Sequence, residues 1–284
     1  MKNYLSLIKF SHTIFALPFA IVGFFLAMRN TNASFDLTLF LLMLACMVTA
    51  RSAAMAFNRY IDRDIDVQNP RTKNREIPAG IINANTALFY VILNSLLFIG
   101  LTYFINNICF FLSPVALLVI LAYSYTKRFT ALCHFVLGLG LSLAPIGAYL
   151  VITGEFALTP VLFSLAVLTW VSGFDIIYSL QDEEFDKSLS LHSIPSVLGK
   201  EGALKLSTLV HVLTALFVIL PGVVDSFSWF YWIGVLVFCS MLIYQHLLVK
   251  PNDLSKVNLA FMTTNGIASI FFAAFFLLDF FIHF

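Results

Sequence analysis

Residues 58–66 read NRYIDRDID, and they end an apolar segment, residues 37–57, whose only charged side chain is Arg51. Asn58, Asp62 and Asp66 recur at every fourth position. Four residues advance an α-helix by about 400°, so the spacing predicts one stripe of oxygen-bearing side chains along one helix face. The combination predicts a membrane-spanning helix that presents acidic side chains where it leaves the lipid.

A second stretch, FDIIYSLQDEEFD at residues 174–186, has the same spacing at the end of another apolar segment. Tyr178, Asp182 and Asp186 follow the three positions of the first stretch at a constant offset of 120 residues. Each stretch is followed by Ile-Pro, at 77–78 and 194–195. We therefore predict a divergent internal repeat within one membrane domain, with halves 1–128 and 129–284.

The composition excludes a soluble, disordered or disulfide-stabilised secreted protein. Of the 284 residues, 60% are hydrophobic and only 11% charged, against roughly a quarter charged in ordinary soluble domains. The net charge of +1 gives no electrostatic case for a nucleic-acid partner. The four cysteines are isolated in apolar stretches, as expected of buried thiols rather than metal ligands. The partner that the composition indicates is the lipid bilayer.

Gaps between charges define nine predicted membrane spans and an all-α fold, since a span needs about 20 apolar residues. The longest uncharged run, residues 77–126, holds two spans with a break near Asn106 and Asn107. The predicted cores are residues 11–28, 37–57, 85–104, 108–125, 131–152, 158–180, 203–220, 229–248 and 258–280.

The basic residues predict the sidedness of these spans. With nine spans, all Lys and Arg residues except Arg29 and Arg51 lie on the same side, including Lys2 and Lys9 before the first span and Lys205 at the start of the span 203–220. By the positive-inside tendency this side is cytoplasmic. We therefore expect an integral protein of a bacterial inner membrane, with the N-terminus and both acidic stretches inside and the C-terminus outside.

Carboxylates that face one another repel unless a cation lies between them, and hard oxygen ligands favour Mg²⁺ over soft transition metals. Because Mg²⁺ is usually bound through one or two carboxylates and substrate phosphates, the two clusters predict a site for a diphosphate. Basic side chains nearby could bind the remaining phosphate oxygens. The candidate metal ligands are Asn58, Asp62, Asp66, Asp182 and Asp186, and the candidate basic residues are Arg63, Arg71, Arg75, Lys127 and Arg128.

Two charges lie deeper. Arg51 precedes Asn58 by seven residues and Asp175 precedes Asp182 by seven, so each shares a helix face with its cluster, about two turns further into the membrane. A charge at that depth usually faces a polar cavity. Arg51 could bind an acidic or phenolic acceptor, and Asp175 could orient it or stabilise positive charge. Alternatively, the two pair with each other. The isolated His134, His211 and His246 are expected to have packing or interfacial roles.

These motifs resemble the UbiA superfamily of intramembrane polyprenyltransferases. The resemblance covers most of the chain, and it implies a nine-helix bundle with a central cavity, two Mg²⁺ ions and attachment of an isoprenoid chain from a polyprenyl diphosphate to an aromatic ring. It also implies catalytic roles for Asp175 and Tyr178 beside the four motif aspartates. The matching positions are Asn58-x-x-x-Asp62-x-x-x-Asp66, Arg71-Thr72-x-x-Arg75, Pro78-x-Gly80 and Asp175-x-x-Tyr178-x-x-x-Asp182-x-x-x-Asp186.

The match departs from the family pattern at two positions. Many relatives carry Asn-Asp where this chain has Asn58-Arg59, and Arg-Pro where it has Arg75-Glu76. Locally, IKFSHTIFALPFA, ARSAAMAFNR, YSYTKRFT and FDIIYSLQDEEFD resemble the branch that serves the futalosine route to menaquinone. The implied aromatic acid is 4-hydroxybenzoate, as in ubiquinone synthesis, or a dihydroxynaphthoate such as 1,4-dihydroxy-6-naphthoate.

Other functions share some of these features. Carboxylates at helix ends and an internal repeat also suit a cation-coupled transporter, although its polar residues should lie near the membrane midplane. Haem farnesylation and alkylation of a lipid glycerol use the same metal chemistry, and a catalytically inactive scaffold is a further alternative.

Overall fold

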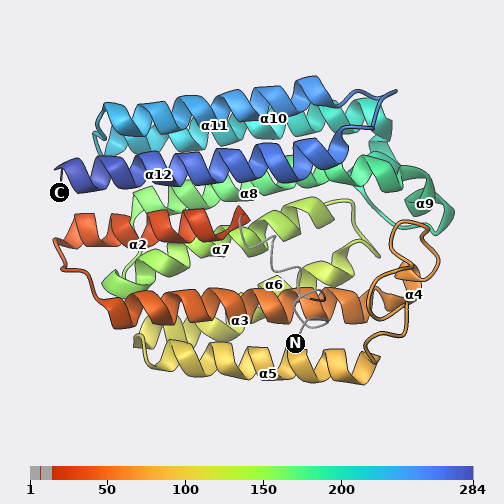
Figure 1. The fold of residues 1–284 in the computed structure, drawn as a ribbon, viewed down its shortest axis with the longest axis horizontal. Helices are drawn as coiled ribbons and strands as arrows, with labels where there is room; N and C mark the ends of the chain where they lie inside the picture. The colour runs from red at the N-terminus through yellow and green to blue at the C-terminus, as the bar shows by residue number, and fades with distance from the viewer. Residues whose placement is uncertain (1–6, 8–14, 284) are drawn as a thin grey trace. The chain divides into compact units, whose positions relative to one another are not determined.

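A computed structural model of the chain describes Leu7 and residues 15–283 (Figure 1). Within this part of the chain every element is helical, apart from one isolated bridge between Lys250 and Asp253. The predicted all-α class is confirmed. The helices that carry the fold are α2 (Leu17–Thr31), α3 (Leu37–Ile61), α5 (Ala84–Tyr103), α6 (Asn107–Thr126), α7 (Cys133–Thr153), α8 (Leu158–Ser179), α10 (Ile194–Val224), α11 (Trp229–Leu248) and α12 (Asn265–His283).

Local sequence signals set several helix ends. The Asp36 carboxylate accepts hydrogen bonds from the backbone N–H groups of Thr38 and Leu39, which caps α3. The Ser193 and Ser196 side chains form a reciprocal capping box at the start of α10. Helix α2 ends at Thr31 and is capped by Asn32, whose φ of 52° is the left-handed conformation common at helix C-termini.

The helices are long and apolar enough to make the chain a multi-pass membrane protein. In the described residues eight helices meet the length and hydropathy of a membrane span, and Leu17–Thr31 is a shorter apolar helix. Residues 11–14 of the first predicted span lie outside the described residues. Large apolar side chains such as Phe89, Leu96 and Leu236 are exposed, as expected of surfaces that face lipid. The predicted break between the third and fourth spans lies between Tyr103 and Asn107.

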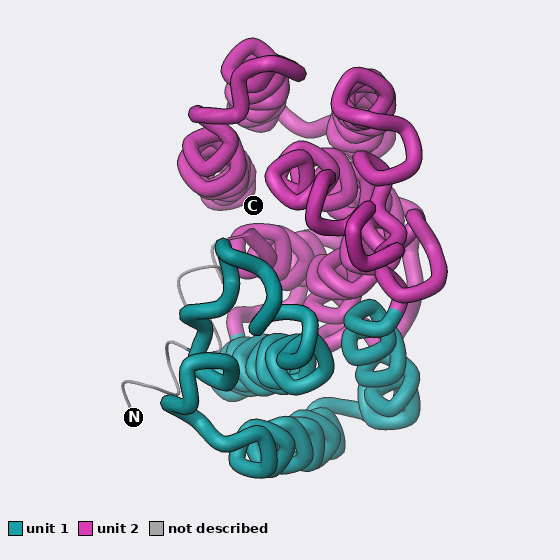
Figure 2. The backbone as a smooth tube through the Cα atoms, turned by 90° about the vertical axis from the view of Figure 1, so that its right-hand side faces the viewer, with its two compact units in different colours: residues 1–13, 36–125 teal, residues 14–35, 126–284 magenta. Residues whose placement is uncertain are grey.

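The chain divides into two compact units, which Figure 2 shows in different colours. Residues 36–125 form the first unit, in which α3 packs against α5 around Ala56, Ala87 and Val91. Residues 15–35 and 126–283 form the second unit. In the second unit α8 packs between α7 and α10, and most of its length is buried.

Small residues allow the central helices of the second unit to approach closely. A Cβ added to Gly138 on α7 would lie 2.4 Å from the Leu168 carbonyl oxygen of α8. A Cβ on Gly23 of α2 would lie 2.1 Å from the Pro145 carbonyl oxygen of α7. Such contacts are typical of helices in lipid, where association depends on close packing and polar contacts more than on burial of apolar surface.

A π-helical turn, Leu259–Thr264, leads into α12. Asn265 stabilises the transition, because its side-chain N–H groups donate to the carbonyls of Ala260 and Phe261. Its oxygen accepts a 2.8 Å hydrogen bond from Trp170 Nε1 of α8. Wide helical turns of this kind often lie near functional sites.

Candidate active site

The first acidic motif lies where α3 ends. The helix stops at Ile61, Asp62 follows with φ −87° and ψ 2°, and a short helix, α4 (Arg63–Asp66), comes next. The predicted stripe is therefore interrupted at its middle residue. Asn58 and Asp62 remain adjacent, and Asn58 Nδ2 donates a 2.8 Å hydrogen bond to Asp62 Oδ2.

Asp66 is buried and is bound by Arg75. Arg75 Nη1 lies 2.8 Å from Asp66 Oδ1 and 2.9 Å from Oδ2. The Thr72 hydroxyl donates to the Asp66 backbone carbonyl at 3.1 Å, which ties the following loop to α4. Gly80, with a φ of 72°, forms the tight turn that closes this loop. The resemblance motif Arg71-Thr72-x-x-Arg75 and Pro78-x-Gly80 thus includes residues that fold the loop back onto the acidic cluster.

The two departures from the family pattern contact each other. Arg59 Nε lies 3.9 Å from Glu76 Oε2, and both side chains are almost completely buried. Arg59 also lies in the electrostatic field of Asp66 and Arg75. A guanidinium is charged at all relevant pH values. The first motif therefore carries a fixed positive charge at Arg59, together with a carboxylate that matches it.

The remaining basic candidates of the first unit have different surroundings. Arg51 lies seven residues before the motif on α3, and its Nε is buried without a hydrogen-bond acceptor among the described residues. Arg63 stacks on the Tyr60 ring and donates to the Tyr60 carbonyl at 2.6 Å, so it is held beside its own helix end. Arg71 is exposed on the loop, where it could reach a ligand in solvent.

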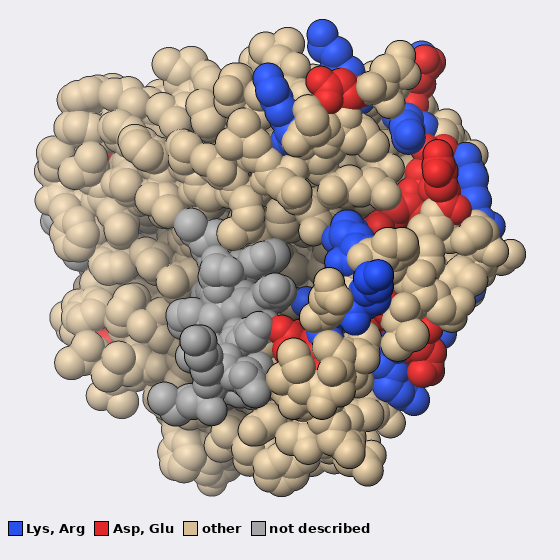
Figure 3. Space-filling view, turned by 45° about the vertical axis from the view of Figure 1, so that its right-hand side comes forward, with Lys and Arg blue, Asp and Glu red and all other residues tan. Residues whose placement is uncertain are grey.

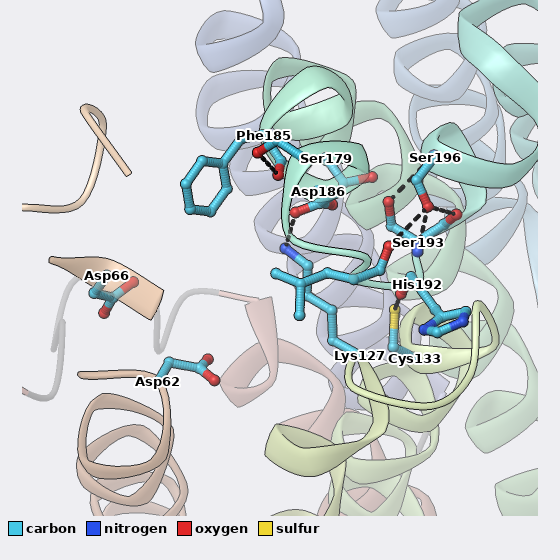
Figure 4. A network of polar contacts seen from close by, with 12 residues as sticks. Asp62, Asp66, Lys127, Cys133, Ser179, Phe185, Asp186, His192, Ser193 and Ser196 are labelled. Carbon is cyan, nitrogen blue, oxygen red and sulfur yellow. Dashed lines mark hydrogen bonds and ion pairs between the residues drawn. The ribbon is translucent and has the colours of Figure 1, made fainter. Parts of the chain in front are cut away.

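The second motif has the same local form as the first. Helix α8 ends at Ser179, a 3-10 turn spans Leu180–Asp182, and a short helix, α9 (Glu183–Ser188), follows. Asp182 and Asp186 are both buried. Figure 4 shows Lys127 reaching Asp186, with Nζ 2.6 Å from Oδ1.

Lys127 is the cation that balances this cluster. Burial alone would lower the pKa of Lys127, but the attraction of Asp186, and more weakly of Asp182, outweighs it and raises the pKa above its usual value of 10.5. The Lys127 amine therefore stays protonated at neutral and mildly alkaline pH. It would lose its charge only in strongly alkaline solution. Arg128, the next residue, is exposed.

The Asp186 carboxylate suits a cation site. Its side chain has no exposed surface, and among the described residues neither oxygen accepts a well-directed hydrogen bond. Such a carboxylate needs positive charge close by, which here is the Lys127 ammonium. No group of three or more His, Cys, Asp and Glu side chains in the described residues is arranged to hold a metal ion alone. An oxygen donor set of this kind fits Mg²⁺ only when phosphate oxygens and water complete it.

Sequence reasoning missed the partner of Asp175. Asp175 Oδ2 lies 2.7 Å from Nδ1 of His134, a residue for which we expected a packing role. The two residues come from adjacent helices, α8 and α7, and no motif spacing connects them, so only tertiary structure could reveal the pair. His211 and His246 also contact each other, with Nδ1 and Nε2 2.8 Å apart.

Tyr178, the remaining candidate on α8, packs against the π-helical turn. Its ring centroid lies 4.2 Å from that of Phe261. On the face that Figure 3 draws, charged side chains gather in one region and most of the remaining surface is uncharged.

The profile of the UbiA prenyltransferase family matches residues 16–276. The chain belongs to this family. Both acidic motifs, the loop between Arg71 and Gly80, and the His134 and Asp175 pair all lie within the matched range. Membership of the UbiA family identifies the chain as a prenyltransferase and decides against the transporter and scaffold alternatives.

Individual relatives agree with this assignment. The 4-hydroxybenzoate octaprenyltransferase of Tolumonas auensis is 30% identical over 237 residues, which cover 83% of this chain and 82% of the relative. The 4-hydroxybenzoate octaprenyltransferase of Vesicomyosocius okutanii subsp. Calyptogena okutanii is 30% identical over 238 residues, which cover 84% of this chain and 86% of the relative.

Solved UbiA structures share the fold. The apo structure of a UbiA homologue from Aeropyrum pernix K1 superposes with a TM-score of 0.85 at 31% identity and covers 94% of this chain and 98% of that one. A UbiA homologue from Archaeoglobus fulgidus, solved with DMAPP and Mg²⁺, gives a TM-score of 0.75 at 22% identity and covers 99% of each chain.

Proposed function

We propose that this UbiA-family enzyme transfers a polyprenyl group from an allylic polyprenyl diphosphate to an aromatic acid in quinone biosynthesis, with release of diphosphate. The proposal includes Mg²⁺ as cofactor and a site on the cytoplasmic side of a bacterial inner membrane. Its strongest support is the buried Asp186, whose charge is balanced by Lys127 at 2.6 Å and whose oxygens have no well-directed hydrogen bond among the described residues.

The two acidic motifs would act on one diphosphate. Asn58, Asp62 and Asp66 of the first motif, and Asp182 and Asp186 of the second, would hold Mg²⁺ together with phosphate oxygens. When bound, the metal would neutralise charge that develops on the leaving diphosphate. The structure of the Archaeoglobus fulgidus homologue with DMAPP and Mg²⁺ supports this pairing of ligand and ion by analogy.

Side chains of this chain would supply the rest of the binding. Lys127 and Arg75 already lie beside motif carboxylates and could turn to phosphate oxygens once metal neutralises those carboxylates. Arg63, Arg71 and Arg128 would add positive charge at the solvent side. Exclusion of water by the apolar helices would protect the allylic cation from hydrolysis.

The acceptor would lie deeper, where Arg51 could bind its carboxylate and Asp175 and Tyr178 could orient its ring. Arg51 Nε is buried with no acceptor among the described residues, which leaves a donor available for such a ligand. The names of the bacterial relatives favour 4-hydroxybenzoate. The local resemblance to the futalosine branch favours a dihydroxynaphthoate instead.

The test is a product assay. Membranes that contain the protein are incubated with Mg²⁺, a labelled allylic diphosphate and, separately, 4-hydroxybenzoate, 1,4-dihydroxy-6-naphthoate, 1,4-dihydroxy-2-naphthoate or haem. We expect a prenylated aromatic acid, identified by mass, that disappears when EDTA replaces Mg²⁺. Prenylated haem, or no product from any acceptor, would contradict the proposal.

Variants link the product to the motifs. Asp62→Ala and Asp182→Ala should each abolish turnover while the protein still inserts and purifies as a folded species. Asp253→Asn is the matched control, because Asp253 is an exposed carboxylate bound to Ser255 in the loop after α11. Full turnover by either motif variant would refute the metal assignment.

A further inference from the structure

His134 connects two helices that carry the second half of the site. Its Nδ1 lies 2.7 Å from Asp175 Oδ2 on α8, and its Nε2 lies 3.2 Å from the backbone nitrogen of Ile194, the first residue of α10. The imidazole is buried, with 3% of its side chain exposed, whereas 23% of the Asp175 side chain is accessible. Asp175 is therefore the member of the pair that a substrate could touch.

The geometry fixes which nitrogen carries the proton. The Ile194 N–H can only donate, so Nε2 must accept and is unprotonated. The proton of the neutral ring then lies on Nδ1, which donates to Asp175. A carboxylate that accepts a hydrogen bond from a fixed N–H donor is held in one orientation. His134 therefore does more than occupy space between α7 and α8.

In the part of the chain that the structure describes, the Asp175 side chain has no second hydrogen-bond partner. Within the described residues its carboxylate bonds to His134 alone, so Oδ1 remains available. Neighbouring polar groups do not reach the Asp175 carboxylate: the Ser172 hydroxyl donates to the backbone carbonyls of Leu168 and His134, and His211 Nε2 approaches the Trp170 carbonyl. Among the described residues, Asp175 Oδ1 is thus the oxygen of this pair that no hydrogen bond occupies.

We propose that His134 is a positioning residue that holds the Asp175 carboxylate in one orientation, with Oδ1 directed at the aromatic acceptor. This inference rests on the proposed function. The ring carbon of the acceptor bonds to the allylic carbon while the bond from that carbon to the diphosphate oxygen breaks, and diphosphate leaves with the electron pair. The ring proton then passes to Asp175 Oδ1, and the electron pair of its C–H bond restores the aromatic ring.

A capping role is the structural alternative, because His134 also accepts the otherwise unpaired N–H at the start of α10. Two substitutions separate the roles. His134→Phe removes both contacts. His134→Asn places an amide donor where Nδ1 was, so it keeps the contact with Asp175, but its shorter side chain cannot reach the Ile194 N–H.

The experiment measures kcat, the KM for the prenyl diphosphate and the melting temperature of each purified variant. We expect His134→Phe to lower kcat about 100-fold with an unchanged KM, as expected when a proton-transfer group is misplaced. His134→Asn should recover kcat to within about tenfold of wild type, although both variants should melt below it. His246→Gln, another helix-embedded histidine, serves as the matched control and should keep wild-type kcat.

A double variant adds a second criterion. If His134 acts through Asp175, then Asp175→Asn and His134→Phe/Asp175→Asn should have the same kcat. Losses that multiply in the double variant, or a His134→Asn enzyme as slow as His134→Phe, would overturn the inference. Failure of the proposed function would look different, because the wild-type enzyme itself would then yield no prenylated acid.

Discussion

At the scale of single residues, each motif pairs a buried carboxylate with one basic side chain. Arg75 binds Asp66 and Lys127 binds Asp186, and in both pairs the carboxylate is far less exposed than the base. Buried charges are stable only when they are paired, so the bases have a structural role before any ligand binds. A bound cation could replace that role and release the bases for phosphate.

Lys127→Met tests this exchange. The substitution leaves Asp186 unpaired in a buried position and should destabilise the protein by about 3 kcal/mol, the low end for a broken buried pair, since one third of the Lys127 side chain is exposed. Mg²⁺ should restore part of the lost stability by taking the place of the ammonium. Thermal unfolding in detergent, with and without Mg²⁺, measures both effects.

Lys187→Met is the matched control for that substitution. Lys187 also forms a 2.6 Å ion pair, with Glu183, but 52% of its side chain is exposed and the pair lies on one short helix. Such pairs contribute about 0.5 kcal/mol. A Lys127→Met variant as stable as this control, or one indifferent to Mg²⁺, would contradict the role assigned to Asp186.

Substitutions at Arg59 and Glu76 should be coupled in their effects on stability and turnover. Arg59→Asp places a third carboxylate beside Asp66 and Glu76, so we expect lower stability and little turnover. Arg59→Asp/Glu76→Pro removes that repulsion and creates the motif common among relatives, so it should recover much of both. Coupling of about 1–3 kcal/mol is expected for residues in one charge network. Additive losses in the double variant would show that the contact has no energetic consequence.

At the scale of elements, two glycines of α7 allow a test of helix packing, in which Gly147 serves as the control for Gly138. Gly138→Ala would place a methyl group 2.4 Å from the Leu168 carbonyl oxygen and 2.5 Å from Ser172 Oγ, so α7 and α8 must separate. We expect a loss of about 1–3 kcal/mol, as for other overpacked interiors. Gly147→Ala on the same helix meets no atom within 4 Å and should be neutral or slightly stabilising. Melting temperatures of the two variants in detergent compare them directly.

The elements were the most predictable feature, for a physical reason. Charges are costly in lipid, so gaps between them locate helices, and the predicted span 229–248 coincides with α11 (Trp229–Leu248). Helix α10 departs from its predicted span, since it begins at Ile194 rather than residue 203. The charged Lys200 and Glu201 had placed this turn in a predicted loop. Gly199, with φ 69° and ψ 175°, interrupts the helix there and lets a charged helical turn precede the apolar part.

The site was less predictable than the spans. Spacing within one segment identified Asn58 and Asp62 as neighbours, and the resemblance identified Arg75 as a site residue. The contacts of Asn58 with Asp62 and of Arg75 with Asp66 are local in sequence. The bond between His134 and Asp175 depends on how α7 packs on α8, and the bond between Arg59 and Glu76 depends on how a loop folds back. Side-chain spacing along one helix contains neither piece of information.

At the scale of the whole molecule, the two acidic motifs belong to different compact units, residues 36–125 and residues 126–283 with 15–35. The proposed function requires both motifs to bind the same diphosphate. If it is correct, neither motif alone is sufficient to bind the diphosphate with Mg²⁺. Binding should then depend on both motifs at once.

Ligand-induced stabilisation tests this requirement without turnover. A non-hydrolysable prenyl diphosphate at about 100 times its Kd should stabilise the wild-type enzyme by about 2.7 kcal/mol in the presence of Mg²⁺. Asp62→Ala in one unit and Asp182→Ala in the other should each remove most of that gain, while Asp253→Asn keeps it. A variant that retains the full melting-temperature shift would show that its motif does not contact the diphosphate, and the shared site would have to be abandoned. Binding of one diphosphate by both motifs requires that Asp62→Ala and Asp182→Ala each lose the ligand-induced shift in melting temperature. Their melting temperatures without ligand should stay unchanged.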